Sequence, residues 1–278
     1  MAIPKRNHIF SRTELFNKNM VLNFNDIKNY DMLTNHARYN RREFVSLIPN
    51  ATYITILRHP LQQFESAFGY FQWGRFIPTK DPISEFLRNP QQYTSVIPWN
   101  TRNGQLFDLG LSSTQTLDEE MVNETMKTLH KEMDVVLITE YFDESLLILR
   151  DLLCWSVNDI LYMSNGIRSD NGHSNLTSTD KDKILEWNKS DLKLYLYFRK
   201  VLFKKIREYG PCFKHHLQEF RKLQNETLEK CIEKERFKDI QGKEFRHVLK
   251  ENATEFCINV WRGDVTFTEL NRKRLSHL

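Results

Sequence analysis

Residues 52–71 constrain the fold of this chain more than any other segment. The first half, 52–57, alternates and is rich in β-branched side chains such as Ile54 and Ile56, which predicts a buried strand. Pro60 suits the first turn of a helix, where a missing N–H group costs no hydrogen bond. The helix that follows carries an apolar stripe made of Phe64, Phe68 and Phe71. The segment therefore predicts a strand that turns directly into a helix.

A second segment of the same kind follows later in the chain. Residues 134–139 are nearly all apolar, as expected of a parallel strand covered on both faces, and helices are predicted at 118–131 and 143–154. Alternating strands and helices indicate an α/β fold with a parallel sheet flanked by helices. A charged helix is predicted over 212–237, and residues 91–116 are interpreted as a long irregular loop.

Arg58 stands where the first predicted strand ends, and Ser66 lies eight residues further on. Ligands of open α/β sheets bind at the carboxyl ends of the strands. A guanidinium fork and a hydroxyl group at such an end can both hold one phosphate. The alternative is that Arg58 is an ordinary surface arginine and Ser66 an ordinary helix serine.

Four segments carry a resemblance to a known family. They are LRHPLQQFESAFGYF at 57–71, EFLRNPQQY at 85–93, FDLG at 107–110 and ITEYFDESLLILRDLLCWSVNDILY at 138–162. The first resembles the 3′-phosphate-binding element of sulfotransferases that use 3′-phosphoadenosine 5′-phosphosulfate (PAPS). Together the four segments resemble the galactose-3-O-sulfotransferase family.

The resemblance implies a fold, a reaction and a compartment. The fold would be a P-loop-type sulfotransferase sheet flanked by helices, with a helical C-terminal part. The reaction would move sulfate from PAPS, without a metal, to the 3-hydroxyl of a galactosyl residue on a glycan or on a glycolipid such as galactosylceramide. The family also implies a glycoprotein of the Golgi lumen or membrane, held by a type II anchor that this chain does not contain.

The resemblance also assigns roles to residues. Arg58 and Ser66 would hold the 3′-phosphate, and His36, in the segment TNHARYNRREF, would be the base that accepts the hydroxyl proton. The alternative for His36 is a hydrogen-bonded or surface histidine. Arg168 would meet the cofactor or the acceptor, and His59 departs from the acidic residue that the family tends to carry there.

Two further segments have ordinary structural readings. Asp143 predicts the N-cap of the helix after the second strand, and Glu140 either positions that turn or contacts a ligand. The run Trp261-Arg262-Gly263-Asp264 is interpreted as a plain turn, and the alternative is the late Arg-Lys-Gly loop that other sulfotransferases use.

The loop that cradles the 5′-phosphosulfate in such enzymes has no counterpart before Arg58. Ser11-Arg12-Thr13 and Lys18-Asn19 are the nearest candidates, and neither follows an apolar strand. We therefore expect an N-terminally truncated family member, with one incomplete domain over 1–237 and an extension over 238–278. The alternative function is a catalytically inactive chain that binds only PAP, the desulfated product, or a partner. A kinase or other phosphoryl transferase is disfavoured, because such an enzyme needs a Walker-type loop and a metal-binding acid, and the sequence shows neither.

Bulk properties narrow the class of protein. The net charge of +4 over 278 residues is mild and gives no reason to expect a nucleic-acid partner. The sequence has no run of 18 apolar residues, so it predicts no membrane-spanning helix. The four cysteines allow three disulfide pairings. Six glycosylation sequons favour the secretory pathway, and they begin at Asn50, Asn123, Asn175, Asn188, Asn225 and Asn252.

Overall fold

The structure is a computed structural model of the chain. It describes all residues except 28, 94, 99–100, 165–175, 241–243 and 276–278. Arg168 and the sequon at Asn175 lie outside the described residues.

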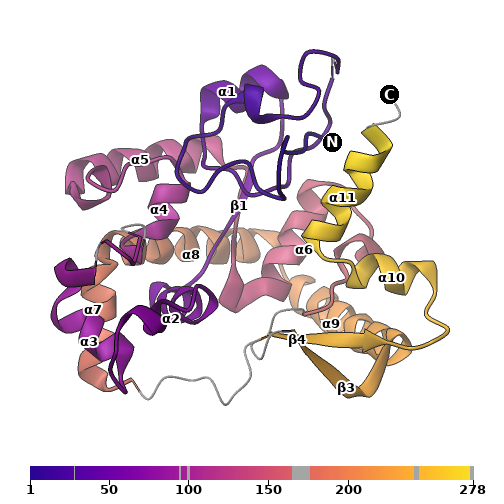
Figure 1. Cartoon of the computed structure of the whole chain (residues 1–278). Coiled ribbons are helices and arrows are strands. Elements are labelled where there is room, and N and C mark those ends of the chain that lie inside the picture. Colours follow the sequence, from indigo (N-terminus) through magenta and orange to yellow (C-terminus); the bar gives the residue numbers. More distant parts are fainter. Residues whose placement is uncertain (28, 94, 99–100, 165–175, 241–243, 276–278) are drawn as a thin grey trace.

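Two parallel strands lie at the centre of the molecule (Figure 1). Strand β1 (Ile54–Leu57) pairs with β2 (Val135–Ile138), in a register that runs from Ile54 opposite Val135 to Leu57 opposite Ile138. Both strands and their parallel direction are as predicted. The carboxyl ends of β1 and β2 therefore meet at one edge, as a ligand site of an α/β protein requires.

The two strands differ in burial. All four residues of β2 are buried, but Ile54 and Ile56 of β1 are 39% and 46% exposed. The prediction that β1 is a buried strand is wrong for these side chains, while Leu57 is buried. The reason lies in the packing, because among the described residues the helices α6 (Phe142–Leu152) and α8 (Lys189–Tyr209) pack closely on β2 rather than on β1.

Helices surround the strand pair, and most begin at a recognisable signal. The helix α2 (Pro60–Tyr70) starts at the predicted proline, and Asp118 caps α5 (Glu119–Glu132) by accepting a hydrogen bond from the N–H of Met121. The other helices of the first 231 residues are α1 (Arg41–Leu47), α3 (Pro82–Arg88), α4 (Gly104–Asp108), α7 (Ser178–Trp187) and α9 (Phe213–Cys231). Short 3-10 turns are η1 (Lys18–Met20), η2 (Trp73–Phe76), η3 (Pro90–Tyr93), η5 (Gln115–Leu117), η6 (Thr139–Tyr141) and η7 (Val157–Ile160).

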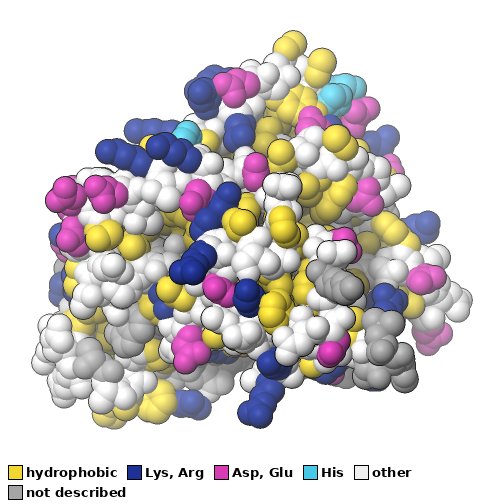
Figure 2. All heavy atoms as spheres, turned by 90° about the horizontal axis from the view of Figure 1, so that it is seen from above, with side chains coloured by type: hydrophobic (Ala, Val, Ile, Leu, Met, Phe, Trp, Pro, Cys, Tyr) yellow, Lys and Arg dark blue, Asp and Glu magenta, His cyan; other side chains and the backbone are white. Residues whose placement is uncertain are grey.

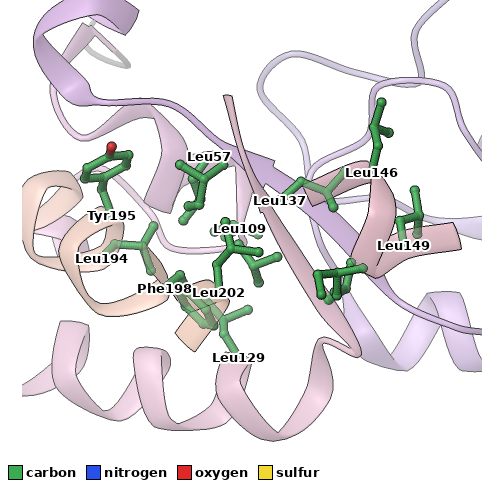
Figure 3. Close-up of a cluster of buried hydrophobic side chains, with 14 of the residues drawn as sticks. Leu57, Leu109, Leu129, Leu137, Leu146, Leu149, Leu194, Tyr195, Phe198 and Leu202 are labelled. Atoms are coloured by element: carbon green, nitrogen blue, oxygen red, sulfur yellow. The ribbon is translucent and has the colours of Figure 1, made fainter. Parts of the chain in front are cut away.

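The main core lies between the strands and the helices that pack on them. Figure 3 shows Leu57 and Leu137, one from each strand, beside Leu194, Phe198 and Leu202 of α8. A second cluster joins α2, α3 and α7 around Phe64, Phe68, Phe86 and Trp73. The predicted stripe of α2 is thus confirmed for Phe64 and Phe68, whereas Phe71 caps the helix and is 37% exposed.

The C-terminal part differs from the predicted helix over 212–237. Helix α9 ends at Cys231, and a hairpin follows, made of β3 (Ile232–Ile240) and β4 (Glu244–Leu249). Cross-strand pairing overrides the helical pattern here, and the proposed domain boundary at 237/238 falls inside β3. The hairpin leads to α10 (Glu255–Trp261) and α11 (Asp264–Leu275). Of the turn predicted over 261–264, only Arg262 and Gly263 lie outside these helices and join them.

Helix α11 returns to the first residues of the chain, next to the N-terminus in Figure 1. Asn35 Nδ2 donates to Thr268 Oγ1 over 2.7 Å, and Arg272 donates to the carbonyl of Asn7 over 2.6 Å. Residues after 238 therefore contact the rest of the chain directly. The division into two parts stays a prediction.

The surface carries charges of both signs. Figure 2 shows Lys and Arg side chains intermixed with Asp and Glu over one face, with hydrophobic side chains between them. Among the described helices, none is long and apolar enough to cross a bilayer.

Asn188 is buried, although it begins a sequon. Its side chain is 1% exposed, its Oδ1 accepts from the N–H of Asn103 over 2.9 Å, and its Nδ2 donates to the carbonyl of Ile184 over 3.0 Å. By contrast, Asn50, Asn225 and Asn252 are exposed.

We expect no glycan on Asn188 in protein secreted from eukaryotic cells, because a glycan on Nδ2 would have no room at this buried position and would disturb the hydrogen bond that Nδ2 donates to Ile184. The measurement is enzymatic deglycosylation in heavy-oxygen water, followed by mass spectrometry of the peptides. Labelling at Asn188 in folded protein would contradict its buried position, and the exposed sequons serve as the comparison.

Candidate functional site

The candidate site begins at the turn between β1 and α2, whose backbone is held by side chains from other elements. The N–H of Arg58 donates to Gln105 Oε1 over 2.8 Å, and Gln105 Nε2 donates to the carbonyl of Arg58 over 2.9 Å. The N–H of His59 donates to Glu140 Oε1 over 2.8 Å. The backbone of this turn is therefore held by one side chain from α4 and one from η6.

The side chain of Arg58 has a donor without an acceptor. Its Nε is buried and makes no hydrogen bond within the described part of the chain. A buried donor left unpaired costs about 1–3 kcal/mol, so water or a bound anion would be favoured beside it, as it would be beside the Nε atoms of Arg102 and Arg272, which are unpaired in the same way among the described residues. A phosphate oxygen fits because arginine binds it with a charge-assisted hydrogen bond.

Ser66 lies on the helix that follows the same turn. It is half-buried in the second turn of α2, on the face opposite to Phe64 and Phe68. Six residues of helix place it about 9 Å along the axis from Pro60. The structure thus brings Arg58 and Ser66 into one strand–turn–helix unit, and their joint hold on a phosphate stays a prediction.

His36 is paired with a carboxylate. Its Nε2 lies 3.5 Å from Asp108 Oδ2, and the two side chains are 42% and 48% exposed. The hydrogen bond to Asp108 is the main cause that raises the pKa of His36, and a backbone contact at Ser11 adds to it. Burial and the charge of Arg12 act in the opposite direction. Asp108 therefore makes His36 a stronger base than a free imidazole and stabilises the imidazolium.

The second strand end supplies a positioning carboxylate. Glu140 holds the His59 N–H with one oxygen, while its Oε2 is buried without a hydrogen-bond partner. The His59 ring lies edge-on to Tyr195, with centroids 5.1 Å apart, and burial lowers the pKa of His59. This favours the positioning reading of Glu140 and leaves a ligand contact open at its second oxygen.

The predicted N-cap at Asp143 is wrong. The cap position of α6 is Tyr141, and it makes no side-chain cap hydrogen bond. Asp143 lies in the first turn, where it accepts from Arg221 over 2.7 Å and from the Tyr162 hydroxyl over 2.8 Å. An acidic residue in the first turn still stabilises the helix through its dipole, so the sequence signal was real but lay two residues after the observed N-cap.

Helix α4 was missed in the sequence, because residues 91–116 were interpreted as irregular. Its start is locked to the start of α8. Asp191 accepts from the N–H groups of Gln105 and Leu106, each over 2.9 Å, and Asn103 Oδ1 accepts from the N–H groups of Ser190 and Asp191, each over 3.2 Å. No local signal marks this helix, because the side chains that hold its start, Asn188 and Asp191, lie 85 and 86 residues away from Asn103 and Gln105.

Two shallow hollows lie at the other end of the strands. Asp134 and Val135 line both, at the amino end of β2, away from Arg58 and Glu140. Among the described residues, no group of three or more His, Cys, Asp or Glu side chains is arranged to hold a metal ion. The metal-free reaction stays a prediction.

A parallel strand pair with an arginine at its carboxyl edge defines an α/β protein of the class whose ligands bind at that edge. The family model described as Galactose-3-O-sulfotransferase matches residues 1–260. The chain belongs to the galactose-3-O-sulfotransferase family. No solved structure matches it.

Individual relatives bear names of the same family. The chain is 34% identical over 190 residues to galactosylceramide sulfotransferase of Mus musculus, which covers 65% of this chain and 44% of that protein. It is 28% identical over 234 residues to galactose-3-O-sulfotransferase 2 of Mus musculus, covering 81% of this chain and 58% of the relative. It is 29% identical over 213 residues to galactose-3-O-sulfotransferase 3 of Bos taurus, covering 72% and 50%. The chain thus spans about half the length of the curated relatives it matches.

Proposed function

We propose that this chain binds PAPS and takes part in transfer of sulfate to the 3-hydroxyl of a galactosyl residue on a glycolipid or glycan. The observation that carries the proposal is the buried, unpaired Nε of Arg58 at the carboxyl end of β1. Family membership supplies the reaction class. Arg58 and Ser66 hold the 3′-phosphate and so set the position of the donor.

The residues then have distinct tasks in the reaction. A bond forms between the acceptor oxygen and sulfur, while the bond from sulfur to the bridging phosphate oxygen breaks and PAP leaves. His36 takes the proton of the acceptor hydroxyl, and Asp108 stabilises the imidazolium that results. Arg58 acts on binding rather than on the proton, because it grips the far end of the donor.

The second candidate is a family member that binds PAP or a partner protein without transferring sulfate. The observation in its favour is that the described residues ahead of β1 form only isolated bridges, η1 and α1, and no strand that turns into a helix. That is the element expected to cradle the 5′-phosphosulfate.

We propose the Golgi lumen as the compartment. The support is a disulfide between Cys231 and Cys257, because disulfides persist in oxidising compartments and are rare in the cytosol. The exposed sequons at Asn50, Asn225 and Asn252 agree with this compartment.

Replacing Arg58 by alanine is expected to weaken PAP binding about 30-fold, because one charge-assisted contact to phosphate contributes about 2 kcal/mol. The measurement is calorimetric titration of PAP into the full chain. Arg58→Lys keeps the charge but not the fork and should recover only part of the affinity. Arg75→Ala, which removes the same charge from the exposed turn η2, is the matched control.

An assay of sulfate transfer from PAPS to galactosylceramide and to a galactose-ended glycan separates the two candidates. Sulfate transfer by the wild-type chain supports the first candidate, an active sulfotransferase, and excludes the second, a family member that binds without transferring sulfate. PAP binding without transfer supports the second candidate. If Arg58→Ala and wild type bind PAP with equal affinity, Arg58 is not part of the donor site.

A further inference from the structure

We infer that α4 holds the donor-binding arginine and the base in register, with Gln105 and Asp108 as its positioning residues. The inference rests on the proposed function, because it concerns how that site is built. Gln105 and Asp108 are three residues apart on one helix, so both project from the same side of it. Gln105 reaches the backbone of Arg58, and Asp108 reaches the ring of His36.

The contact to Arg58 is a two-point clamp. The carboxamide of Gln105 accepts from the Arg58 N–H over 2.8 Å and donates to the Arg58 carbonyl over 2.9 Å. A carboxamide carries a donor and an acceptor side by side on one uncharged planar group, and asparagine, which has the same group, is one carbon shorter. The clamp replaces the sheet partner that the end of β1 would otherwise need, and it fixes the direction in which the guanidinium leaves the strand.

The contact to His36 is supported by docking of its whole segment on the end of α4. The N–H of Tyr39 donates to the carbonyl of Asp108 over 2.7 Å, and Arg38 Nε donates to the carbonyl of Phe107 over 3.0 Å. The Arg38 guanidinium also lies 3.3 Å from the centre of the Phe107 ring. These contacts satisfy carbonyl groups that a helix leaves open at its end.

Each residue of the FDLG segment at 107–110 has a structural role in this arrangement. Its last residue, Gly110, has φ +107°, and a Cβ there would lie 2.9 Å from the carbonyl oxygen of Tyr39. Only glycine therefore allows the segment that carries His36 to approach so closely. Phe107 supports Arg38, Asp108 pairs with His36, and Leu109 is buried in the core.

The other end of α4 cannot move without breaking buried contacts. Asp191 is fully buried and accepts hydrogen bonds from the N–H groups of Gln105 and Leu106, while Asn103 Oδ1 accepts from the N–H of Asp191 at the start of α8. Helix α8 in turn packs on β2. Helix α4 therefore contacts both the turn that carries Arg58 and the segment that carries His36, and it holds the two in fixed positions.

The test uses the full chain and two readouts that report the two arms separately. Gln105→Met, close in size but without hydrogen-bonding groups, should weaken PAP binding about tenfold and leave the pKa of His36 unchanged. Asp108→Asn should lower the pKa of His36 toward its ordinary value of about 6.5, as measured by NMR titration of the ring. The same variant should bind PAP as tightly as wild type. Gln115→Met and Asp81→Asn, which alter exposed residues of the same types, should change neither readout.

The outcomes separate this inference from the proposed function. If wild type binds PAP and Gln105→Met binds it equally well, the clamp has no positioning role although the donor site stands. An unchanged His36 pKa in Asp108→Asn overturns the second arm. Failure of the wild-type chain to bind PAP would overturn the donor site and the Gln105 arm together, and the NMR titration would still decide the Asp108 arm.

Discussion

Raising the pH from about 4 to about 7 is expected to remove about 4 kcal/mol of folding stability through Asp191 alone. Burial is the main cause that raises the pKa of Asp191 from 3.8 to about 7, and the charge of Asp108 adds to it. Hydrogen bonds from Gln105 and Leu106 act in the opposite direction. At about 1.36 kcal/mol per pH unit, the difference between 3.8 and about 7 corresponds to about 4 kcal/mol.

The sign follows from proton binding. Between the two pKa values, the folded chain holds a proton on Asp191 that the unfolded chain has lost. The unfolded state therefore binds fewer protons in this window, and stability falls as the pH rises through it. Below pH 3.8 both states are protonated and the cost is absent.

The measurement is urea unfolding of wild type and Asp191→Asn at several pH values. The stability of wild type relative to Asp191→Asn should fall steadily across the window, because the amide cannot ionise. Asp182→Asn, which changes an exposed aspartate on α7, should leave the pH dependence as in wild type. Parallel curves for wild type and Asp191→Asn would show that Asp191 ionises in the folded chain as it does in water.

Asp191 also shows where sequence reasoning reaches its limit. The strands β1 and β2, the proline that starts α2 and the buried Phe64 and Phe68 all follow from local patterns of apolar residues. Each of these signals lies within a window of about 20 residues. The α/β class, and the carboxyl edge where Arg58 stands, could therefore be predicted.

The contacts that position the site, made by Gln105, Asp108 and Asp191, could not be predicted from the sequence. Gln105 and Arg58 are 47 residues apart, Asp108 and His36 are 72 apart, and Gln105 and Asp191 are 86 apart. No local pattern specifies such partners, because the hydrogen bonds form only once the elements have packed. Helix α4 is also only five residues long, which is too short to show a helical period.

The hairpin was missed for a related reason. The sequence after Cys231 continues the charged, helix-compatible composition of α9, yet the chain turns into β3 there. Pairing between β3 and β4 and the disulfide from Cys231 to Cys257 both depend on residues further along the chain. The four cysteines allowed three pairings, and spacing alone could not choose among them.

That disulfide is expected to contribute about 3.5 kcal/mol to stability. It closes a loop with a sequence separation of 26 residues, and the chain-entropy relation gives this value for a loop of that length. Both cysteines are buried, beside Met163, Ile232 and a shell of partly buried apolar residues. Replacing both by alanine should therefore lower the free energy of unfolding by at least this amount, since small cavities add to the loss.

The loss should also be local, because the bond ties the end of α9 to α10 across the hairpin. Hydrogen exchange in the Cys231→Ala/Cys257→Ala variant should rise in α10 and the hairpin before it rises in β2. Cys154→Ser and Cys212→Ser change the two exposed free cysteines and are the matched controls. Thiol titration of the denatured, unreduced wild type should find those two thiols only. Four reactive thiols, or equal unfolding midpoints for the alanine variant and wild type, would contradict a disulfide that stabilises this end of the molecule.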